Sequence, residues 1–519
     1  MESLVASLSP EIRALIASLR KDVTSSTIST TSGLNYYFLE EQAKNIYPVF
    51  YPLLASIPRT APMQRGVKVG GPAINYKGIV AIDPGGYPGL SEGNRNSLLS
   101  VTERDFAASY KWLGKDTAVT FQAEQTGLGL DDNVGLAQLG ALNALLNAEE
   151  RMILWGNSGT AGNGYALGTC NTPTLADAGA VAGATLPSTT FYKVYAVALA
   201  GWGIDLATAT GVQPTFSRTT ANGVTETVSG GVGAISAVSN EIELTATGHG
   251  LTATVTAQTG ALGYAWYLGS AASTGGETAA TSYFVGITAA PTITITAQPA
   301  NTNQNAAASG LSSDNSFSSL DFDGIISWIV GAAAQGTSQA PYFKNLGGTS
   351  LTSNGDGTIA QIETALQYMW QNFKIAPDYI LCSIDQAQPI TTAILNGGAN
   401  SATRVFFNMS QTGGIQGGSF TSEYRSKFSV SGLAKPLPVR VHPWLPSGTI
   451  LLYTVNNPYP AAGGSIPSVL RVVALEDHFG LRYPFTTLEY SMGVYCFETL
   501  QNYIPFAHAL LCGIGSASN

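Results

Sequence analysis

The most regular hydrophobic pattern in the chain lies at residues 131–156, where apolar residues recur at mixed spacings of three and four. This periodicity predicts one helix of about 26 residues, roughly 39 Å long. Asp131, Asp132 and Asn133 supply capping oxygens at its start, and Gly156 ends it. The apolar stripe consists of Val134, Leu136, Leu139, Leu142, Leu145, Leu146 and Ile153. Other backbones are expected to approach closely over the small residues, which are Gly135, Ala137, Gly140, Ala141, Ala144 and Ala148.

The segments before this helix have a different pattern. Residues 1–61 predict an N-terminal arm, in which Ser9 and Pro10 begin a short amphipathic helix and residues 34–47 form an aromatic helical piece. These aromatics either build a local core or cover a neighbouring subunit. Residues 62–126 hold 13 charged residues and predict two long strands joined by the turn-rich stretch DPGGYPGLSEGN. Such a hairpin is marginal alone, so we expect it to lie across another surface.

After the helix the pattern changes twice more. Residues 173–300 carry only eight charges and alternate short strand-like runs with Gly, Ser and Thr turns, which predicts a β-sandwich of immunoglobulin or fibronectin type. Residues 317–480 return to mixed helix and strand patterning, and DYILCS predicts a buried strand. One helical face there is formed by Ile359, Ile362, Leu366, Met369, Trp370 and Phe373. The chain ends in one or two long strands.

Composition narrows the class of protein. Charged residues make up 11% of the chain, against about 25% in an ordinary soluble domain, which suits a surface that neighbours largely cover. No apolar run approaches the ~18 residues of a membrane span. The net charge of −9 argues against general affinity for nucleic-acid phosphates. The N-terminus lacks the basic and apolar regions of a secretory signal, so we expect synthesis inside a cell.

Candidate chemistry is sparse. Gly89 to Gly93 match the G-x-S-x-G pattern around Ser91, but a hairpin tip lacks the strand-to-helix turn that this nucleophile motif needs. The glycines of residues 156–168 lack the Lys-Ser/Thr ending of a phosphate loop and predict a flexible connection. Asp356 is expected to act in a turn or as a helix cap, because no ladder of calcium ligands follows it. Glu149 and Glu150 are adjacent on the helix and do not face each other, so we expect ion pairs with Arg151 or a neighbouring segment.

Histidines and cysteines give no recognisable metal or disulfide pattern. The histidines share no ligand spacing, and His442, in an apolar strand end, is expected to be structural; they are His249, His442, His478 and His508. The cysteines form no CxxC pair, which favours neither a zinc site nor a small disulfide framework. They are Cys170, Cys382, Cys496 and Cys512.

Four stretches resemble, in this order, the major capsid protein of tailed bacteriophages, which has the Hong Kong 97 fold. NAEERMILWGNSG is similar to the end of the family's spine helix, and IETALQYMWQNFKIAPDYILCS to the helix and strand of its central A domain. PVRVHPWLPSGTILLYTVNNPYP is similar to the late A-domain strands. LEYSMGVYCFETLQNYIPFAHALLCGI is similar to the strand that returns through the peripheral P domain. The resemblance covers nearly all of the chain except residues 173–300 and rests on order and spacing, since no single motif is diagnostic.

The resemblance implies an α+β protein with the Hong Kong 97-type capsid fold. Its parts would be the N-terminal arm (1–61), the E-loop (62–126), the P domain with the spine helix (127–172), the A domain (317–480) and the return strands of the P domain (481–519). Residues 173–300 would form an inserted all-β immunoglobulin-like sandwich, which we expect on the outer face of the shell as a decoration or lattice-contact module.

The resemblance also implies a function and partners. The chain would be a virion capsid protein, made in the bacterial host cytoplasm, that forms hexamers and pentamers of an icosahedral head around double-stranded DNA without sequence-specific binding. A portal protein and separate scaffolding or decoration proteins would be its partners. No enzymatic activity, cofactor, metal or membrane association is expected. The alternative is a surface or tail-associated adhesin, which should carry a signal peptide or repeated sandwiches.

Some members of the family cross-link neighbouring subunits through an E-loop lysine and an asparagine. The lysines in the corresponding segment are Lys68, Lys77, Lys111 and Lys115, and nothing in the sequence selects one. Our hypothesis is that no covalent cross-link forms. A ladder of covalent multimers on a denaturing gel of mature particles would contradict it.

Overall fold

The computed structural model divides the chain into two compact units, Met1–Phe50 and Tyr51–Asn519. The described residues are 51–64, 67–68, 70–82, 88–96, 98, 101–127, 132–308, 310–334, 340–354, 357–396, 421–428, 435–459, 466, 468–485 and 487–515. The helices predicted at Ser9 and at residues 34–47 lie outside them, as does the predicted turn or cap at Asp356.

The long helix is confirmed as α5 (Asn133–Trp155), capped by Asp132, whose side chain accepts a hydrogen bond from the Gly135 N–H. Gly156 follows it with φ of −50°, so it does not adopt a left-handed conformation. A glycine is needed there because an added Cβ would lie 2.4 Å from the Phe322 carbonyl oxygen. The apolar stripe is only partly covered within the chain, since Leu136 and Leu139 remain 45% and 51% exposed.

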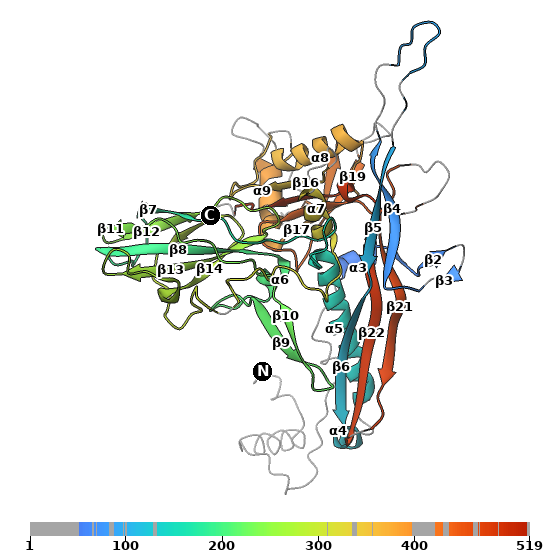
Figure 1. Cartoon of the computed structure of the whole chain (residues 1–519), viewed down its shortest axis with the longest axis horizontal. Helices are drawn as coiled ribbons and strands as arrows, with labels where there is room; N and C mark the ends of the chain where they lie inside the picture. Colours follow the sequence, from blue (N-terminus) through green and yellow to red (C-terminus); the bar gives the residue numbers. More distant parts are fainter. Residues whose placement is uncertain are drawn as a thin grey trace, which may run out of the picture. The chain divides into compact units, whose positions relative to one another are not determined.

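A four-stranded sheet packs along α5, in the order β1 (Arg59–Thr60), β21 (Leu470–Arg482), β22 (Glu489–Asn502) and β6 (Lys111–Thr120). Figure 1 shows the last three strands running side by side along the helix. Short α4 (Phe121–Gly127) connects β6 to α5, so residues predicted to end a strand are helical instead. We call this the spine sheet.

The predicted hairpin divides at Tyr110. The part next to the predicted turn is β4 (Ala73–Ile82) paired with β5 (Val101–Ser109), and these form a separate two-stranded sheet. Strands β2 (Met63–Gln64) and β3 (Val67–Lys68) pair just before it in the sequence. Phe106, Ala108 and Tyr110 are buried at alternate positions, whereas the next buried residue is Leu113. This change of parity turns the chain over, because alternate strand residues face opposite sides. The descending strand therefore leaves β4 and continues as β6 in the spine sheet.

A second, six-stranded sheet has the order β16 (Tyr342–Asn345), β23 (Ala509–Cys512), β20 (Ile450–Tyr453), β17 (Tyr379–Cys382), β19 (Lys435–Val441) and β18 (Glu423–Ser426). Its helices are α7 (Ile325–Ala334), α8 (Ala360–Phe373) and α9 (Ala387–Asn396), with 3-10 turns at Ile384–Gln386 and Pro505–Ala507. The helical face predicted for α8 is confirmed except at Trp370, which is half-buried. The helix ends at Lys374, which adopts φ of 57°.

Sheet membership differs from the predicted division at residues 480 and 481. Strand β21 begins at Leu470, inside the predicted A domain, yet pairs with β22 of the spine sheet. Strand β23 lies in the predicted return segment, yet pairs with β16 and β20 of the six-stranded sheet. The chain thus enters the spine sheet earlier than expected and leaves it again before its end.

The low-charge region is all-β except for α6 (Gly201–Asp205) and a 3-10 turn at Ala279–Thr281. One antiparallel sheet contains β11 (Ile242–Leu244), β8 (Thr190–Leu199), β13 (Gly263–Ala271) and β14 (Ser282–Thr288); the other contains β15 (Thr292–Ile295), β12 (His249–Thr254) and β7 (Thr174–Ala180). Tyr192 and Trp266 of the first share a core with Leu251 of the second. A separate hairpin, β9 (Thr215–Thr219) and β10 (Thr225–Ser229), extends from them. The immunoglobulin-type assignment stays a prediction.

The all-β region extends beyond its predicted limit at residue 300, since Asn315 pairs with Val232 through backbone hydrogen bonds. Among the described residues, none of the helices is long and apolar enough to cross a membrane.

Candidate functional site

The segment that leaves the N-terminal unit is fixed on α5 by a buried carboxylate. Residues 51–60, here called the strap, contain the short helix α3 (Pro52–Ser56). Tyr51 provides no side-chain cap for it. Instead, the N–H groups of Leu53 and Leu54 donate to the two carboxylate oxygens of Glu150, at 2.8 and 2.9 Å. Glu150 thus satisfies N–H groups that the first turn of a helix leaves free, and its negative charge suits that end of the helix dipole.

Glu150 also joins the strap to the six-stranded sheet. His442, at the end of β19, lies 3.0 Å from Glu150 through its Nε2, and both side chains are fully buried. The His442 Nδ1 accepts a hydrogen bond from the Trp444 N–H at 3.3 Å. Nδ1 therefore carries no proton, and Nε2–H donates to Glu150. The structural role predicted for His442 is confirmed.

Glu149 anchors the other end of the strap. Arg59 donates to Glu149 and to Glu498 of β22, and its Nε donates to Asp477 of β21 at 2.7 Å. His478 Nε2 lies 2.8 Å from the second oxygen of Glu149. Backbone pairing supports this arrangement, since Arg59 is in register with Val472 in a parallel strand pair. The expected ion pair with a neighbouring segment is confirmed for Glu149, through Arg59, whereas Glu150 accepts hydrogen bonds from Leu53, Leu54 and His442.

Arg59, Glu149, Asp477, His478 and Glu498 form what we call the charged cluster. It contains three carboxylates but only one guanidinium. Burial lowers the pKa of Arg59, but the charges of Glu498 and Glu149 outweigh this and hold it above its ordinary value. Burial and the neighbouring Glu149 raise the pKa of Glu498 well above its ordinary value. Glu149 has its pKa lowered, because hydrogen bonding from His478 and the charge of Arg59 exceed the effect of burial. The buried thiol of Cys496, whose pKa is raised by burial, lies beside these groups.

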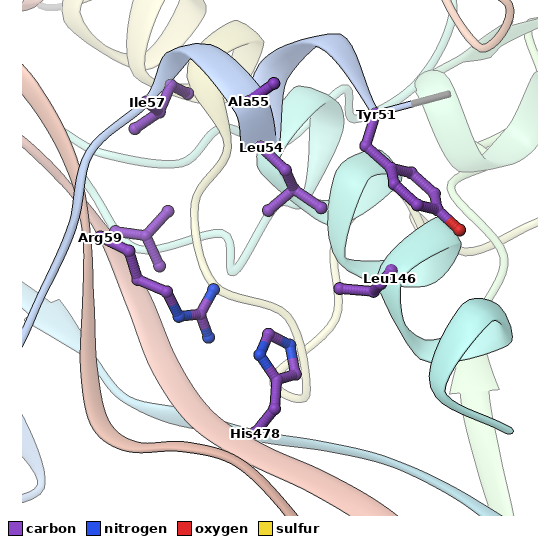
Figure 2. A pocket seen from close by; sticks show the side chains of 8 residues that line it. Tyr51, Leu54, Ala55, Ile57, Arg59, Leu146 and His478 are labelled. Carbon is purple, nitrogen blue, oxygen red and sulfur yellow. The ribbon is translucent and has the colours of Figure 1, made fainter. Parts of the chain in front are cut away.

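A hollow of about 440 Å3 lies between the strap, α5 and β21. Its walls are mainly apolar, and Arg59 and His478 supply its polar part. Figure 2 shows these two side chains pointing toward one another. The charged cluster therefore borders this hollow through Arg59 and His478. The His478 side chain is 23% exposed.

Arg151 donates from Nε to the Asn147 carbonyl oxygen on α5, and its ion pair is with another element. Its Nη1 donates to Asp205 at the end of α6 at 2.8 Å, and its guanidinium lies over the rings of Trp202 and Trp444. These contacts join α5 to the all-β region and to the loop after β19. A cation between two aromatic rings is stabilised by both of them.

The glycine-rich run after α5 is a packed turn, so the predicted flexible connection was wrong. Asn157 is buried and donates from its amide to the carbonyl oxygens of Tyr165 and Ser316. Ser158 donates through both its N–H and its hydroxyl to Asp323. The returning segment thus holds this run through the backbone carbonyl oxygen of Ser316 and the carboxylate of Asp323.

The other sequence candidates do not form a catalytic group in the part of the chain that the structure describes. Ser91 Oγ accepts a hydrogen bond from the Asn94 side chain in an exposed loop. His249 contacts Asp177, and His508 is buried, with its Nδ1 accepting from the Thr454 N–H. Burial lowers the pKa of His508 to about 3. All four cysteine thiols are free and buried.

Two buried carboxyl groups beside the glycine-rich turn predict a pH dependence. Burial raises the pKa of Asp321 to about 7 and that of Asp323 to about 6. An unfolded chain loses these protons near pH 4, so the folded state binds more protons above that pH and its stability falls as pH rises to about 7. Urea unfolding of Asp321→Asn should therefore show a smaller loss of stability between about pH 5 and about pH 8 than the unmodified chain.

The difference between the two proteins isolates Asp321, because Glu498 also has a raised pKa and contributes to the unmodified slope with the same sign. Glu226→Gln on the exposed β9–β10 hairpin is the control and should leave the slope unchanged. Equal pH slopes in Asp321→Asn and the unmodified protein would refute the assignment.

Comparisons with known proteins give structures but no sequence family. No family model matches the sequence, and no curated protein matches it. The similar solved structures include phage capsids. The capsid asymmetric unit of cyanophage A-1(L) is 10% identical with a TM-score of 0.38, covering 95% of this chain and 99% of that one. The capsid of the myovirus XM1 is 7% identical with a TM-score of 0.34, covering 94% and 100%.

The phage G major capsid and decoration proteins give 7% identity and a TM-score of 0.31, with coverage of 94% and 100%. Phage capsid structures thus resemble the chain along most of its length. Because these TM-scores are below 0.5, the functional proposal rests on the features of the chain itself.

Proposed function

We propose that this chain is the major capsid protein of a tailed double-stranded DNA bacteriophage. In this proposal many copies assemble as hexamers and pentamers into an icosahedral head. The chain has no catalytic role, and it encloses DNA without reading its sequence.

The observation that carries the proposal is the hairpin of β4 and β5, which packs on the rest of the chain through Tyr76 and Phe106 but is not joined to either large sheet. Strands β4 and β5 pair with each other over up to ten residues each and with no third strand among the described residues. An isolated two-stranded hairpin is marginal in water. A second copy that receives the hairpin would complete its burial, as obligate interfaces of about 2,000 to 5,000 Å2 do.

A second feature supports the same assembly. Leu136, Leu139 and Gly140 are exposed on α5, and Leu136 borders a surface hollow that it shares with residues of β6. A contiguous apolar stripe of this kind on a soluble protein marks an interaction site. The stripe is therefore assigned to a contact between copies.

The sheets suggest how the parts of the capsid fold map onto the chain. The N-terminal arm is residues 1–61. The E-loop is residues 62–126 without β6 and α4, which belong to the P domain. The spine sheet and α5 form the P domain, and the six-stranded sheet with its helices forms the A domain, which adds β23 to residues 317–480 and removes β21 from them. The all-β region that starts at residue 173 is the inserted immunoglobulin-like domain.

Sedimentation velocity of the purified chain tests the proposal. Species of five or six copies, or larger closed particles, are expected to grow with concentration. A chain that stays monomeric at high concentration, with intact secondary structure, would contradict it.

A further inference from the structure

Side chains from α5, β21 and β22 present three different kinds of metal-ligand atom to one point beneath the strap. A carboxylate oxygen of Glu149, a ring nitrogen of His478 and the sulfur of Cys496 all lie within 4.8 Å of one another. Oxygen, nitrogen and sulfur donors together are typical of Zn²⁺ sites and unlike the all-oxygen sites of Ca²⁺ or Mg²⁺. All three residues stand on regular elements, which hold ligands more rigidly than loops do.

The Glu498 carboxylate is a second, independent observation that points to a bound cation at this cluster. Its side chain is fully buried, and its Oε1 has no hydrogen-bond partner among the described residues. It lies two residues beyond Cys496 on β22, so both face the same side of the sheet. Arg59 pairs with Oε1 of Glu149 and Oε2 of Glu498, so Oε2 of Glu149 faces His478 and Oε1 of Glu498 has no partner among the described residues.

The neighbour of His478 suits metal binding as well. Its Nδ1 lies 3.2 Å from the Asp477 carboxylate. A carboxylate at that position holds the proton on Nδ1 and leaves Nε2 as the ligand, an arrangement common at zinc-binding histidines. The Nε2 already faces Glu149, at 2.8 Å.

We propose that Glu149, His478 and Cys496 form a binding site for Zn²⁺ or a divalent transition metal of similar chemistry, with the Glu498 carboxylate as an outer partner beside it. Binding would displace the proton from the thiol and any proton on Nε2, so protons are released to solvent. The three carboxylates and the thiolate then carry four negative charges, of which Arg59 and a divalent ion offset three. Of the proposed ligands, His478 lines the hollow, so an ion would approach from that side.

Cobalt titration of the full chain tests this proposal. Co²⁺ in a tetrahedral site with a thiolate ligand gives a sulfur-to-metal charge-transfer absorption and intense visible bands. The unmodified chain should develop both at one equivalent, and Zn²⁺ should abolish them. Cys496→Ser should lose the charge-transfer absorption, whereas Cys382→Ser, which alters a buried free thiol of the six-stranded sheet, should retain it.

A second variant keeps the test decisive if Cys496→Ser does not fold. Glu498→Gln should fold and bind Zn²⁺ roughly 10- to 100-fold more weakly in competition with a chelator of known affinity. His249, which contacts Asp177 at the surface, is the control, and His249→Ala should not change the tight binding. No charge-transfer absorption in the unmodified chain, or unchanged affinity in both Cys496→Ser and Glu498→Gln, would overturn the proposal. Because the readout is metal binding by the subunit, failure here leaves the proposed shell function intact.

Discussion

Replacing Arg59 with methionine is expected to lower the free energy of unfolding by about 3–5 kcal/mol. Methionine keeps much of the length of the arginine side chain but cannot pair with Glu149, Glu498 or Asp477. Glu149 and Glu498 are fully buried, and a buried charge that loses its partner retains the full cost of its desolvation. The strap should detach at this end, while Leu53 and Leu54 stay bound to Glu150.

Chemical denaturation at neutral pH measures this loss. Arg425→Met is the matched control, because Arg425 is 75% exposed and pairs only across the surface with Glu423; its effect should stay within about 1 kcal/mol. A loss in Arg59→Met no larger than that of the control would mean that the ion pairs of Arg59 do not hold the strap.

Replacing Gly140 with leucine is expected to prevent assembly without destabilising the subunit. An added Cβ at Gly140 meets nothing within 4 Å in the chain. Leucine is also a better helix former than glycine, by about 0.5–1 kcal/mol. The isolated subunit should therefore be as stable as the unmodified one or slightly more so. A neighbouring copy packed on the stripe of Leu136 and Leu139 would instead meet the larger side chain.

Sedimentation and thermal unfolding together separate these effects. Gly140→Ala is the control, since it gains helix propensity and remains small, and it should assemble normally. Normal particles from Gly140→Leu would refute close packing of a neighbour on α5. Loss of subunit stability in Gly140→Leu would refute the open space that the structure places there.

Local patterns were sufficient to predict the main elements. The periodicity of Leu145 and Ile153 and the capping oxygen of Asp132 predicted α5, and the face that includes Ile362 and Met369 predicted α8. The point at which the descending strand turns over, Tyr110, also has a sequence signal, because Phe106 and Leu113 are an odd number of positions apart and both are buried. That signal can be recognised only once the burial of these residues is known.

The candidate site could not be predicted in the same way. Its contacts join Glu150 to His442 across 292 positions and Arg59 to Glu498 across 439 positions. No local periodicity encodes such pairs, because they depend on which strands become neighbours. The one available signal was the presence of two adjacent glutamates in a helix otherwise poor in charge. The glycine-rich turn was misread for a related reason, since its hydrogen-bond partners Ser316 and Asp323 lie 159 and 165 positions further along the chain.

Negative-stain electron microscopy of the purified, unmodified chain tests the central claim most directly. The account predicts hexamers, pentamers, tubes or closed shells of uniform wall. Fields that contain only monomers at high concentration, from protein that circular dichroism shows to be folded, would contradict it.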